Sequence, residues 1–199
     1  MDDGHRSVLI SGHSFSRRLE AFIRARTTTQ AGRAVSRDFW LSRACVDFHS
    51  IPGCNIPRYR SRLLPYIRDF PYDIVYVELG VVDLSNRALS PELVAQNLAS
   101  LAFSLQNIQA VQSVILGAPL CRPVNPPNMP DFPTRLQKFS DILKDLVKDY
   151  PKVKVWDHRR LWRRNPHNYQ PDGIHLSDMG NLQYYKSIRG ILDRKLKCI

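Results

Sequence analysis

Short runs of apolar and β-branched residues recur along the chain, separated by longer segments with helical periodicity. Such runs are typical of buried strands because they are short, rich in Val and Ile, and bounded by turn-forming residues. They occupy residues 7–11, 44–51, 73–79, 113–116 and 153–157. The pattern therefore predicts five strands.

Between these runs, apolar residues return at intervals of three and four, as on the buried face of an amphipathic helix. Helices are expected around residues 19–23, 63–67 and 134–150. Ser90 and Pro91 predict a further helix start, an N-cap followed by proline at the first helical position. The last helix follows Ser177, and its predicted buried stripe comprises Met179, Leu182, Tyr185, Ile188 and Leu192.

This alternation of strands and helices predicts an α/β fold with a parallel sheet and helices on both faces. Sites in such folds lie beyond the carboxyl ends of the strands. Residues 121–133 contain five prolines and are expected to form an irregular loop near that edge.

The composition agrees with one folded domain spanning residues 1–199, since 43% of the residues are hydrophobic and 24% are charged. No apolar run approaches the roughly 20 residues of a membrane span, and the first residues lack the apolar core of a secretory signal. These absences predict an intracellular protein, cytoplasmic by default, with a nuclear location left open. The four scattered cysteines have no metal-site spacing, so no metal is expected.

The charge is strongly basic, with 29 Lys and Arg against 18 Asp and Glu, a formal net charge of +11. A polyanion such as nucleic acid would be attracted to this protein. A solvated basic surface that only aids solubility is an equally good interpretation.

Two polar segments stand where the fold would place a site. Ser14 follows the first strand and precedes a helix, so its hydroxyl is either an N-cap or a nucleophile held near a helix N-terminus. Asp172 and His175 lie on a turn before the last helix, where the carboxylate can hold one imidazole nitrogen and leave the other as a base. Each segment alone is weak support for chemistry.

Four segments together resemble the sequence blocks of the SGNH (GDSL-type) hydrolases. They are GHSFS after the first strand, Gly53 after the second, Gly80-Val81-Val82-Asp83 after the third, and DGIHLS before the last helix. The resemblance implies a flavodoxin-like three-layer α/β/α sandwich with a five-stranded parallel sheet. It also implies hydrolysis of small-molecule esters and related acyl bonds without a cofactor.

Carried over to this chain, the resemblance implies Ser14 as nucleophile, His175 as general base and Asp172 as its partner. It implies an oxyanion hole built from the backbone N–H groups of Ser14 and Gly53 and a side-chain amide. The family has Asn where this chain has Val82, so the side-chain donor is lost. Loss of one oxyanion donor costs a serine hydrolase roughly 100- to 1,000-fold in turnover.

Two nearby amides, Asn55 and Asn86, are candidates to replace the missing donor. His13 stands where the family has the Asp of Gly-Asp-Ser. Because that Asp is not part of the triad, His13 is expected to be a loop residue with a satisfied ring, although it could titrate near neutral pH.

A set of arginines could form an anion-binding rim beside the site. It comprises Arg17, Arg18, Arg159, Arg160, Arg163 and Arg164, the last four between Trp156 and Tyr169. The alternative is that the aromatic residues are core and the arginines extend outward into solvent.

Two functions remain open from the sequence. The first is a serine esterase weakened by Val82. The second is a catalytically silent SGNH-like binding domain, with nucleic acid as the candidate partner and a loose resemblance to retroelement-encoded domains.

Overall fold

Five parallel strands form the centre of the molecule. The computed structural model describes residues 5–27, 35–162 and 165–199. The strands are β1 (Arg6–Gly12), β2 (Ala44–Ser50), β3 (Ile74–Glu78), β4 (Ser113–Gly117) and β5 (Val153–Trp156). They lie in the order β2-β1-β3-β4-β5, and each neighbouring pair is parallel. The predicted five-stranded parallel sheet is confirmed.

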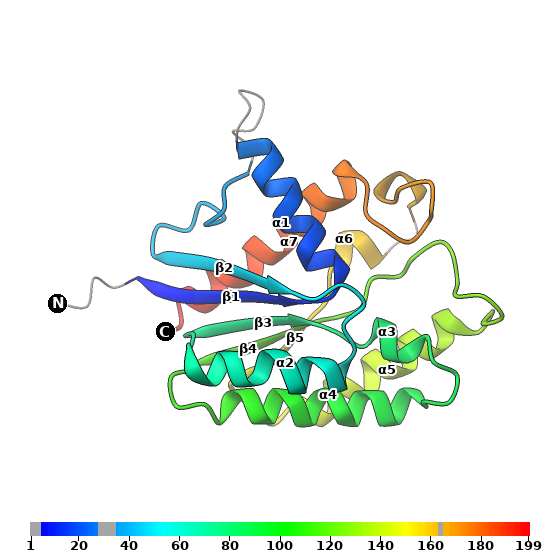
Figure 1. The fold of residues 1–199 in the computed structure, drawn as a ribbon, viewed down its shortest axis with the longest axis horizontal. Helices are drawn as coiled ribbons and strands as arrows, with labels where there is room; N and C mark the ends of the chain where they lie inside the picture. The colour runs from blue at the N-terminus through cyan, green and yellow to red at the C-terminus, as the bar shows by residue number, and fades with distance from the viewer. Residues whose placement is uncertain (1–4, 28–34, 163–164) are drawn as a thin grey trace.

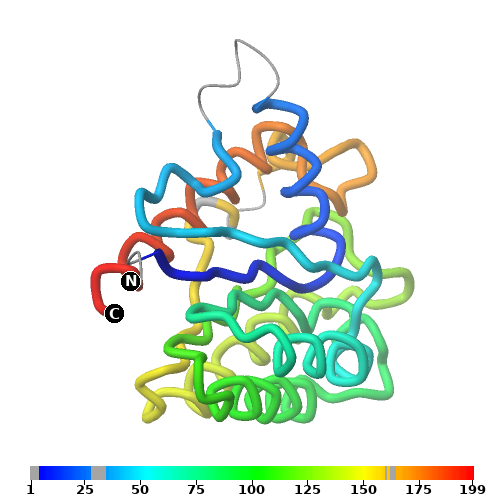
Figure 2. The backbone as a smooth tube through the Cα atoms, turned by 60° about the vertical axis from the view of Figure 1, so that its left-hand side comes forward, coloured from blue at the N-terminus to red at the C-terminus, as the bar shows by residue number. Residues whose placement is uncertain are grey.

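Helices cover both faces of this sheet (Figure 1). One face carries α1 (Ser14–Thr27), α6 (Arg159–Trp162) and α7 (Asp178–Leu196). The other face carries α2 (Ile56–Asp69), α3 (Val81–Leu84), α4 (Pro91–Gln106) and α5 (Phe132–Val147). The turned view in Figure 2 separates the same three layers. The structure is thus the α/β/α sandwich that the resemblance implies.

Alternate residues of the central strands enter two separate hydrophobic cores. Val8, Ile10 and Tyr76 face the layer of α1 and α7, whereas Leu9 and Val75 face the layer of α2, α4 and α5. All five side chains are completely buried. Because both faces are covered, these strands are apolar at nearly every position, which explains their appearance as continuous apolar runs.

Capping side chains mark the helix starts that the sequence predicts. Ser90 Oγ accepts a hydrogen bond from the Leu93 N–H at 3.2 Å at the start of α4, and Ser177 Oγ accepts one from the Gly180 N–H at 3.2 Å at the start of α7. The sequence did not predict α3, α6 or the 3₁₀ turn η2 (Pro166–Asn168). Segments of three or four residues are too short to show a helical period.

The predicted buried stripe of α7 is wrong in its first turn. Met179 is 55% exposed, and Gly180 and Asn181 are buried in its place. A Cβ on Gly180 would lie 2.0 Å from the carbonyl oxygen of Asn168, so this turn of α7 packs directly on the backbone of η2. Close backbone packing requires a small residue where the periodicity alone predicts an apolar one. Of the helices in the described ranges, none has both the length and the apolar character that crossing a membrane demands.

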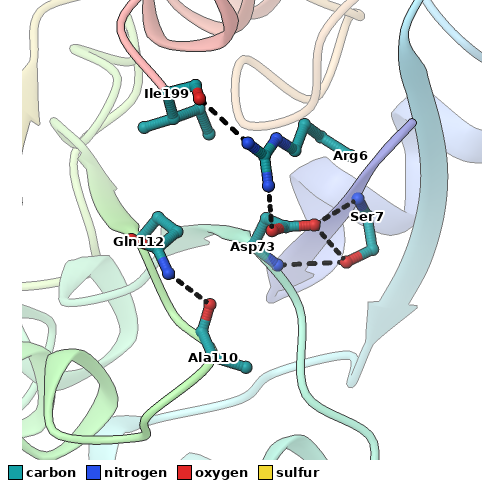
Figure 3. A network of polar contacts seen from close by, with 6 residues as sticks. All are labelled: Arg6, Ser7, Asp73, Ala110, Gln112 and Ile199. Carbon is teal, nitrogen blue, oxygen red and sulfur yellow. Dashed lines mark hydrogen bonds and ion pairs between the residues drawn. The ribbon is translucent and has the colours of Figure 1, made fainter. Parts of the chain in front are cut away.

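A polar network ties the amino ends of β1 and β3 together (Figure 3). The Asp73 carboxylate accepts hydrogen bonds from the Ser7 N–H at 2.8 Å, the Ser7 hydroxyl at 2.9 Å and the Arg6 guanidinium at 3.2 Å. Arg6 also donates to the carbonyl oxygen of Ile199 at 2.9 Å. The network therefore joins two central strands to the end of the chain after α7.

Replacement of Asp73 should destabilise the fold measurably. Asp73→Ala removes one carboxylate that accepts three hydrogen bonds, and we expect the free energy of unfolding to fall by about 1–2 kcal/mol. Urea unfolding followed by circular dichroism measures this change. The matched control is Asp69→Ala at the exposed end of α2, which should cost nothing because a carboxylate there is not favoured by the helix dipole. Equal effects of the two changes would contradict the importance of the network.

Candidate active site

The turn after β1 brings Ser14 to the carboxyl edge of the sheet. Gly12 has φ 146°, and a Cβ there would lie 2.3 Å from the carbonyl oxygen of Glu78. Only glycine therefore allows the end of β1 to lie so close to β3. Ser14 follows as the first residue of α1, and α3 begins at the same edge (Figure 1). Orphan N–H groups and the positive dipole end of α1 thus surround Ser14.

The Ser14 side chain does not act as a helix cap. Among the described residues, its hydroxyl is hydrogen bonded to His13 Nδ1 at 3.4 Å rather than to a backbone N–H of α1. The side chain is only partly buried. Of the two interpretations that the sequence left open, the N-cap is therefore not what the hydroxyl does in this structure.

Asp172 and His175 form a tight pair on the turn before α7. His175 Nδ1 lies 2.7 Å from Asp172 Oδ2, and Asp172 Oδ1 accepts hydrogen bonds from the N–H groups of Ile174 at 2.8 Å and His175 at 2.9 Å. Partial burial acts to raise the pKa of Asp172, but the hydrogen bonds from the His175 N–H and imidazole and from the Ile174 N–H lower it to about 2. The ionised carboxylate holds Nδ1 and leaves Nε2 of His175 as the available base.

The serine and histidine segments lie at the same edge of the sheet. The rings of Phe15 and His175 meet edge to face with centroids 6.4 Å apart, and the charge of His175 acts on the pKa of His13. No hydrogen bond joins Ser14 to His175 in the described residues. The fold therefore brings the two segments together while the Ser14 hydroxyl is directed to His13.

The positions implied for an oxyanion hole surround this point. Gly53 lies in the turn after β2 with φ 61°, a conformation that favours glycine. Val82 lies on α3 and packs partly buried against the core. Asn55 caps α2 by accepting from the Arg58 N–H, and Asn86 accepts from the Ala88 N–H, both at 3.0 Å. In both residues the side-chain oxygen is engaged in a local cap or turn.

A buried acid lies behind Ser14. Glu78 is 1% exposed, and neither of its carboxylate oxygens has a hydrogen-bond partner in the described structure. Its Oε1 lies 4.0 Å from His13 Nε2. Burial raises the pKa of Glu78 well above its ordinary value. Burial, with the charges of Arg122 and His175, lowers the pKa of His13 to about 4. Burial thus favours the neutral form of both side chains.

This acid and histidine are not part of a larger metal-binding group. Within residues 5–27, 35–162 and 165–199, no three His, Cys, Asp or Glu side chains are grouped so that they could hold a metal ion. The sequence did not single out Glu78 because it stands inside a strand pattern. Its only signal is a charged residue in an otherwise continuous apolar run.

Arg122 is a further cation in this region that the sequence analysis missed. Its guanidinium donates to Ser85 Oγ at 3.4 Å and lies 4.8 Å above the ring of Phe132. Its Nε atom is buried without a hydrogen-bond partner among the described residues, and burial lowers the pKa of the group. Arg122 lies in the proline-rich loop after β4, where no periodic pattern draws attention to a residue.

A cavity of about 500 Å³ adjoins the Asp172 turn. Its walls come from the loop after β4, including Val124, and from η2 and the following residues, including Tyr169 and Gly173. Gly173 has φ 62°, and a Cβ there would lie 2.2 Å from Val124 Cγ2. The loop of residues 121–133, which the sequence predicted near this edge, thus contacts the Asp172 turn directly.

The arginines predicted to form an anion-binding rim lie only partly within the described residues. Arg17 is exposed on α1, and Arg18 donates to the side chain of Gln170 at 3.5 Å, close to the Asp172 turn. Arg159 lines a separate cavity with residues of α5, β5 and α7. Arg163, Arg164 and the side chain of Arg160 lie outside the described residues. The rim as a whole stays a prediction.

Replacing Glu78 should flatten the dependence of stability on pH. Burial raises the pKa of Glu78 in the folded chain, whereas the unfolded chain ionises it at about pH 4.3. The free energy of unfolding should therefore fall as the pH rises above about 4.3. Glu78→Gln has no proton to lose, so this fall should become smaller. Urea unfolding at several pH values measures the slope, and the wild-type slope in Glu78→Gln would contradict a raised pKa for the buried acid.

Solved structures of the same architecture superimpose on most of the chain. A proposed acylhydrolase from Bacteroides fragilis matches with a TM-score of 0.76 and 16% identity, covering 98% of this chain and 90% of its own. A lipase/acylhydrolase from Enterococcus faecalis gives 0.69 and 16%, with 96% of both chains covered. The acetylxylan esterase Axe2 from Geobacillus stearothermophilus gives 0.69 and 15%, with 94% of both chains covered. Similarity at these identities establishes the shared fold.

The family is established by a match to the sequence itself. No curated protein sequence matches the chain. The model of the GDSL-like Lipase/Acylhydrolase family, however, matches residues 12–182, which include every position from Ser14 to His175 described above. The chain therefore belongs to the GDSL-like lipase/acylhydrolase family of SGNH hydrolases.

Proposed function

We propose that the protein is a serine esterase that hydrolyses small-molecule acyl esters. Ser14 is the nucleophile, His175 the general base and Asp172 the carboxylate that orients it. The observation that carries this proposal is the 2.7 Å contact between His175 Nδ1 and Asp172 Oδ2, at the edge of the sheet where Ser14 begins α1. Membership of an acylhydrolase family supports the same assignment.

The reaction proceeds through an acyl-enzyme. The Ser14 hydroxyl transfers its proton to His175 Nε2 while Oγ bonds to the acyl carbon. The tetrahedral intermediate then breaks its bond to the alcohol oxygen, which takes the proton from His175. A water molecule next gives a proton to His175 and attacks the acyl carbon, and Ser14 regains that proton as the acid leaves.

The Ser14 hydroxyl must turn before it can react, because its hydrogen-bond partner in the structure is His13 Nδ1. At 3.4 Å this is a long hydrogen bond between two neutral groups, and breaking it costs at most about 1 kcal/mol. Substrate that displaces the hydroxyl toward His175 can supply that energy. The neutral state of His13 keeps a positive charge away from the nucleophile in the resting site.

The cavity beside the Asp172 turn favours a small organic group. At about 500 Å³, and with Val124, Tyr169 and three prolines in its walls, it suits an acyl or alcohol group of modest size. The acetylxylan esterase and the lipase/acylhydrolase that share the fold act in the same general class of reaction by their names. Among the similar structures are catalytic mutants of that acetylxylan esterase in which a serine or an aspartate is replaced by alanine.

A catalytically silent binding domain is the second candidate function. Two observations favour it, since Val82 offers no oxyanion donor and the Ser14 hydroxyl is bonded to His13 rather than to His175. Covalent labelling of the nucleophile separates this candidate from the esterase.

A fluorophosphonate probe should label the wild-type protein and fail to label Ser14→Ala. Phosphonylation requires a serine activated by a base, so surface hydroxyls remain unlabelled. Ser61→Ala on α2 is the control and should be labelled like the wild type. In-gel fluorescence and intact-protein mass measure the outcome. A folded wild-type protein that takes no label would favour the silent domain.

Val82→Asn should raise ester hydrolysis at least about tenfold, because the amide adds a third donor to the oxyanion site. Initial rates with p-nitrophenyl acetate measure kcat/KM. Val82→Ala is the matched control, since it changes the size of the side chain without adding a donor, and it should give no rise. Equal rates in Val82→Asn and Val82→Ala would show that the missing amide is not what limits turnover.

A further inference from the structure

A second and larger cavity lies along the free edge of the sheet. It has a volume of about 1180 Å³ and is walled by α5, β5 and α7. In the described chain β5 pairs with β4 alone, so the other side of β5 forms the floor of this cavity. In Figure 1 the two helix layers stand above and below the sheet. None of Ser14, Asp172 and His175 lines this space.

The floor presents backbone groups that a further strand could use. The Lys152 carbonyl accepts from the Val114 N–H at 2.8 Å, and the Trp156 carbonyl accepts from the Ala118 N–H at 2.9 Å. The backbone N–H and carbonyl groups of the even-numbered residues in this segment therefore point toward β4. Those of the odd-numbered residues point outward, as the period of a parallel ladder requires. The Val153 N–H already donates to the Tyr150 carbonyl at 2.9 Å. Val155 is left with both its N–H and its carbonyl directed into the cavity.

The walls are strongly basic. Seven Lys and Arg side chains line the cavity, against two Asp. Both acids are neutralised already, since Asp157 pairs with Lys144 at 2.9 Å and Asp193 with Lys197 at 2.7 Å. Five of the cations, Lys154, Arg159, Lys186, Arg189 and Arg194, have no ion pair with any described residue. They give the cavity a net positive charge that complements an occupant with negative charge.

The five cations that pair with no described residue lie on the α7 side of the free edge. Val153 and Val155 point into the core shared with α4 and α5, so Lys154 and Trp156 point toward α7. An added strand would send alternate side chains to the same two sides. Those on the α7 side meet Lys186 and Arg189. On the other side Lys148, at the end of α5, already pairs with Asp145 at 2.8 Å. Acidic residues at alternate positions of an added strand thus find unpaired cations on the α7 side.

There is also room for a strand between the helices. A Cβ added to Gly190 on α7, one of the lining residues, would meet no atom within 4 Å. The backbone of α7 beside β5 is therefore unoccupied at this point. A bulky side chain there would close the cavity from the α7 side.

We propose that this cavity binds an extended acidic segment of a partner protein, which adds to the sheet beside β5. Backbone hydrogen bonds at Val155 hold the segment, and its carboxylates pair with the unpaired cations of β5 and α7. This binding site is independent of the esterase proposed above.

Peptide is favoured over nucleic acid by the one aromatic side chain in the walls, Trp156. Its ring is covered by the Arg194 guanidinium at 5.3 Å, and its indole N–H donates to Ser187 Oγ at 3.0 Å. It is therefore not an open platform for stacking a base. A sheet edge presents both backbone donors and acceptors, which match a peptide, whereas the phosphates of a nucleic acid only accept hydrogen bonds.

The test uses a fluorescein-labelled peptide of about ten residues composed of Glu, Asp and Thr, with fluorescence anisotropy as the readout. A peptide with Gln and Asn in place of the acids is the ligand control. We expect saturable binding of the acidic peptide alone, weakened at least about tenfold by the double change Lys186→Glu and Arg189→Glu. Arg62→Glu, an exposed cation on α2 outside the cavity, is the matched control and should bind like the wild type.

The backbone contact is tested separately with Val155→Pro. Proline removes the outward N–H without taking a hydrogen bond from β4, so peptide binding should weaken several-fold at unchanged charge. Circular dichroism checks that the variant folds. Hydrogen exchange of the wild-type protein tests the same contact without a substitution, since the Val155 amide should be protected when peptide is bound.

Two outcomes would overturn the proposal. One is an absence of saturable peptide binding to the wild type. The other is binding that depends on Lys186 and Arg189 but leaves Val155 exchange unchanged, with an oligonucleotide of equal charge binding as tightly. That second result would make the cavity a general polyanion site.

Discussion

The close approach of β1 to β3 at Gly12 is the constraint on which the site depends. Parallel strands end at the same edge of a sheet, and only a residue without a Cβ lets β1 finish against the Glu78 carbonyl and turn at once into α1. That turn sets Ser14 at a helix N-terminus. Gly53 after β2 and α3 after β3 reach the same edge for the same topological reason. The two halves of the proposed catalytic machinery meet because of sheet geometry, before any specific side-chain contact forms.

The strands and most of the helices could be predicted because short sequence patterns mark them. Runs of Val and Ile are short and bounded, and both faces of β1 and β3 are buried, so the apolar run itself marks each strand. Helix starts at Ser90 and Ser177 were predictable from capping chemistry. The first turn of α7 was not, since Met179 points outward and Gly180 packs on Asn168. That contact is made between segments that the fold brings together, so the spacing of apolar residues along α7 does not reveal it.

The site could be predicted only in part. Ser14, Asp172 and His175 stand out because hydroxyl, carboxylate and imidazole occur beside turns in a recognisable order. Glu78 and Arg122 did not, since a buried acid in a strand and a cation in a proline-rich loop have meaning only once their neighbours are known. The arginine rim is a further case, since the cavity that Arg159 lines is formed by elements distant in the sequence.

The link from Arg6 to the carbonyl oxygen of Ile199 has an architectural consequence. Both residues lie at the amino edge of the sheet, and Ser14 lies at the carboxyl edge (Figure 1). A domain fused ahead of Arg6 or behind Ile199 would therefore project from the molecule on the side remote from the nucleophile. A domain attached at this end leaves the edge of the sheet that carries Ser14 uncovered. Gene fusion can therefore combine this fold with other domains without covering its candidate active site.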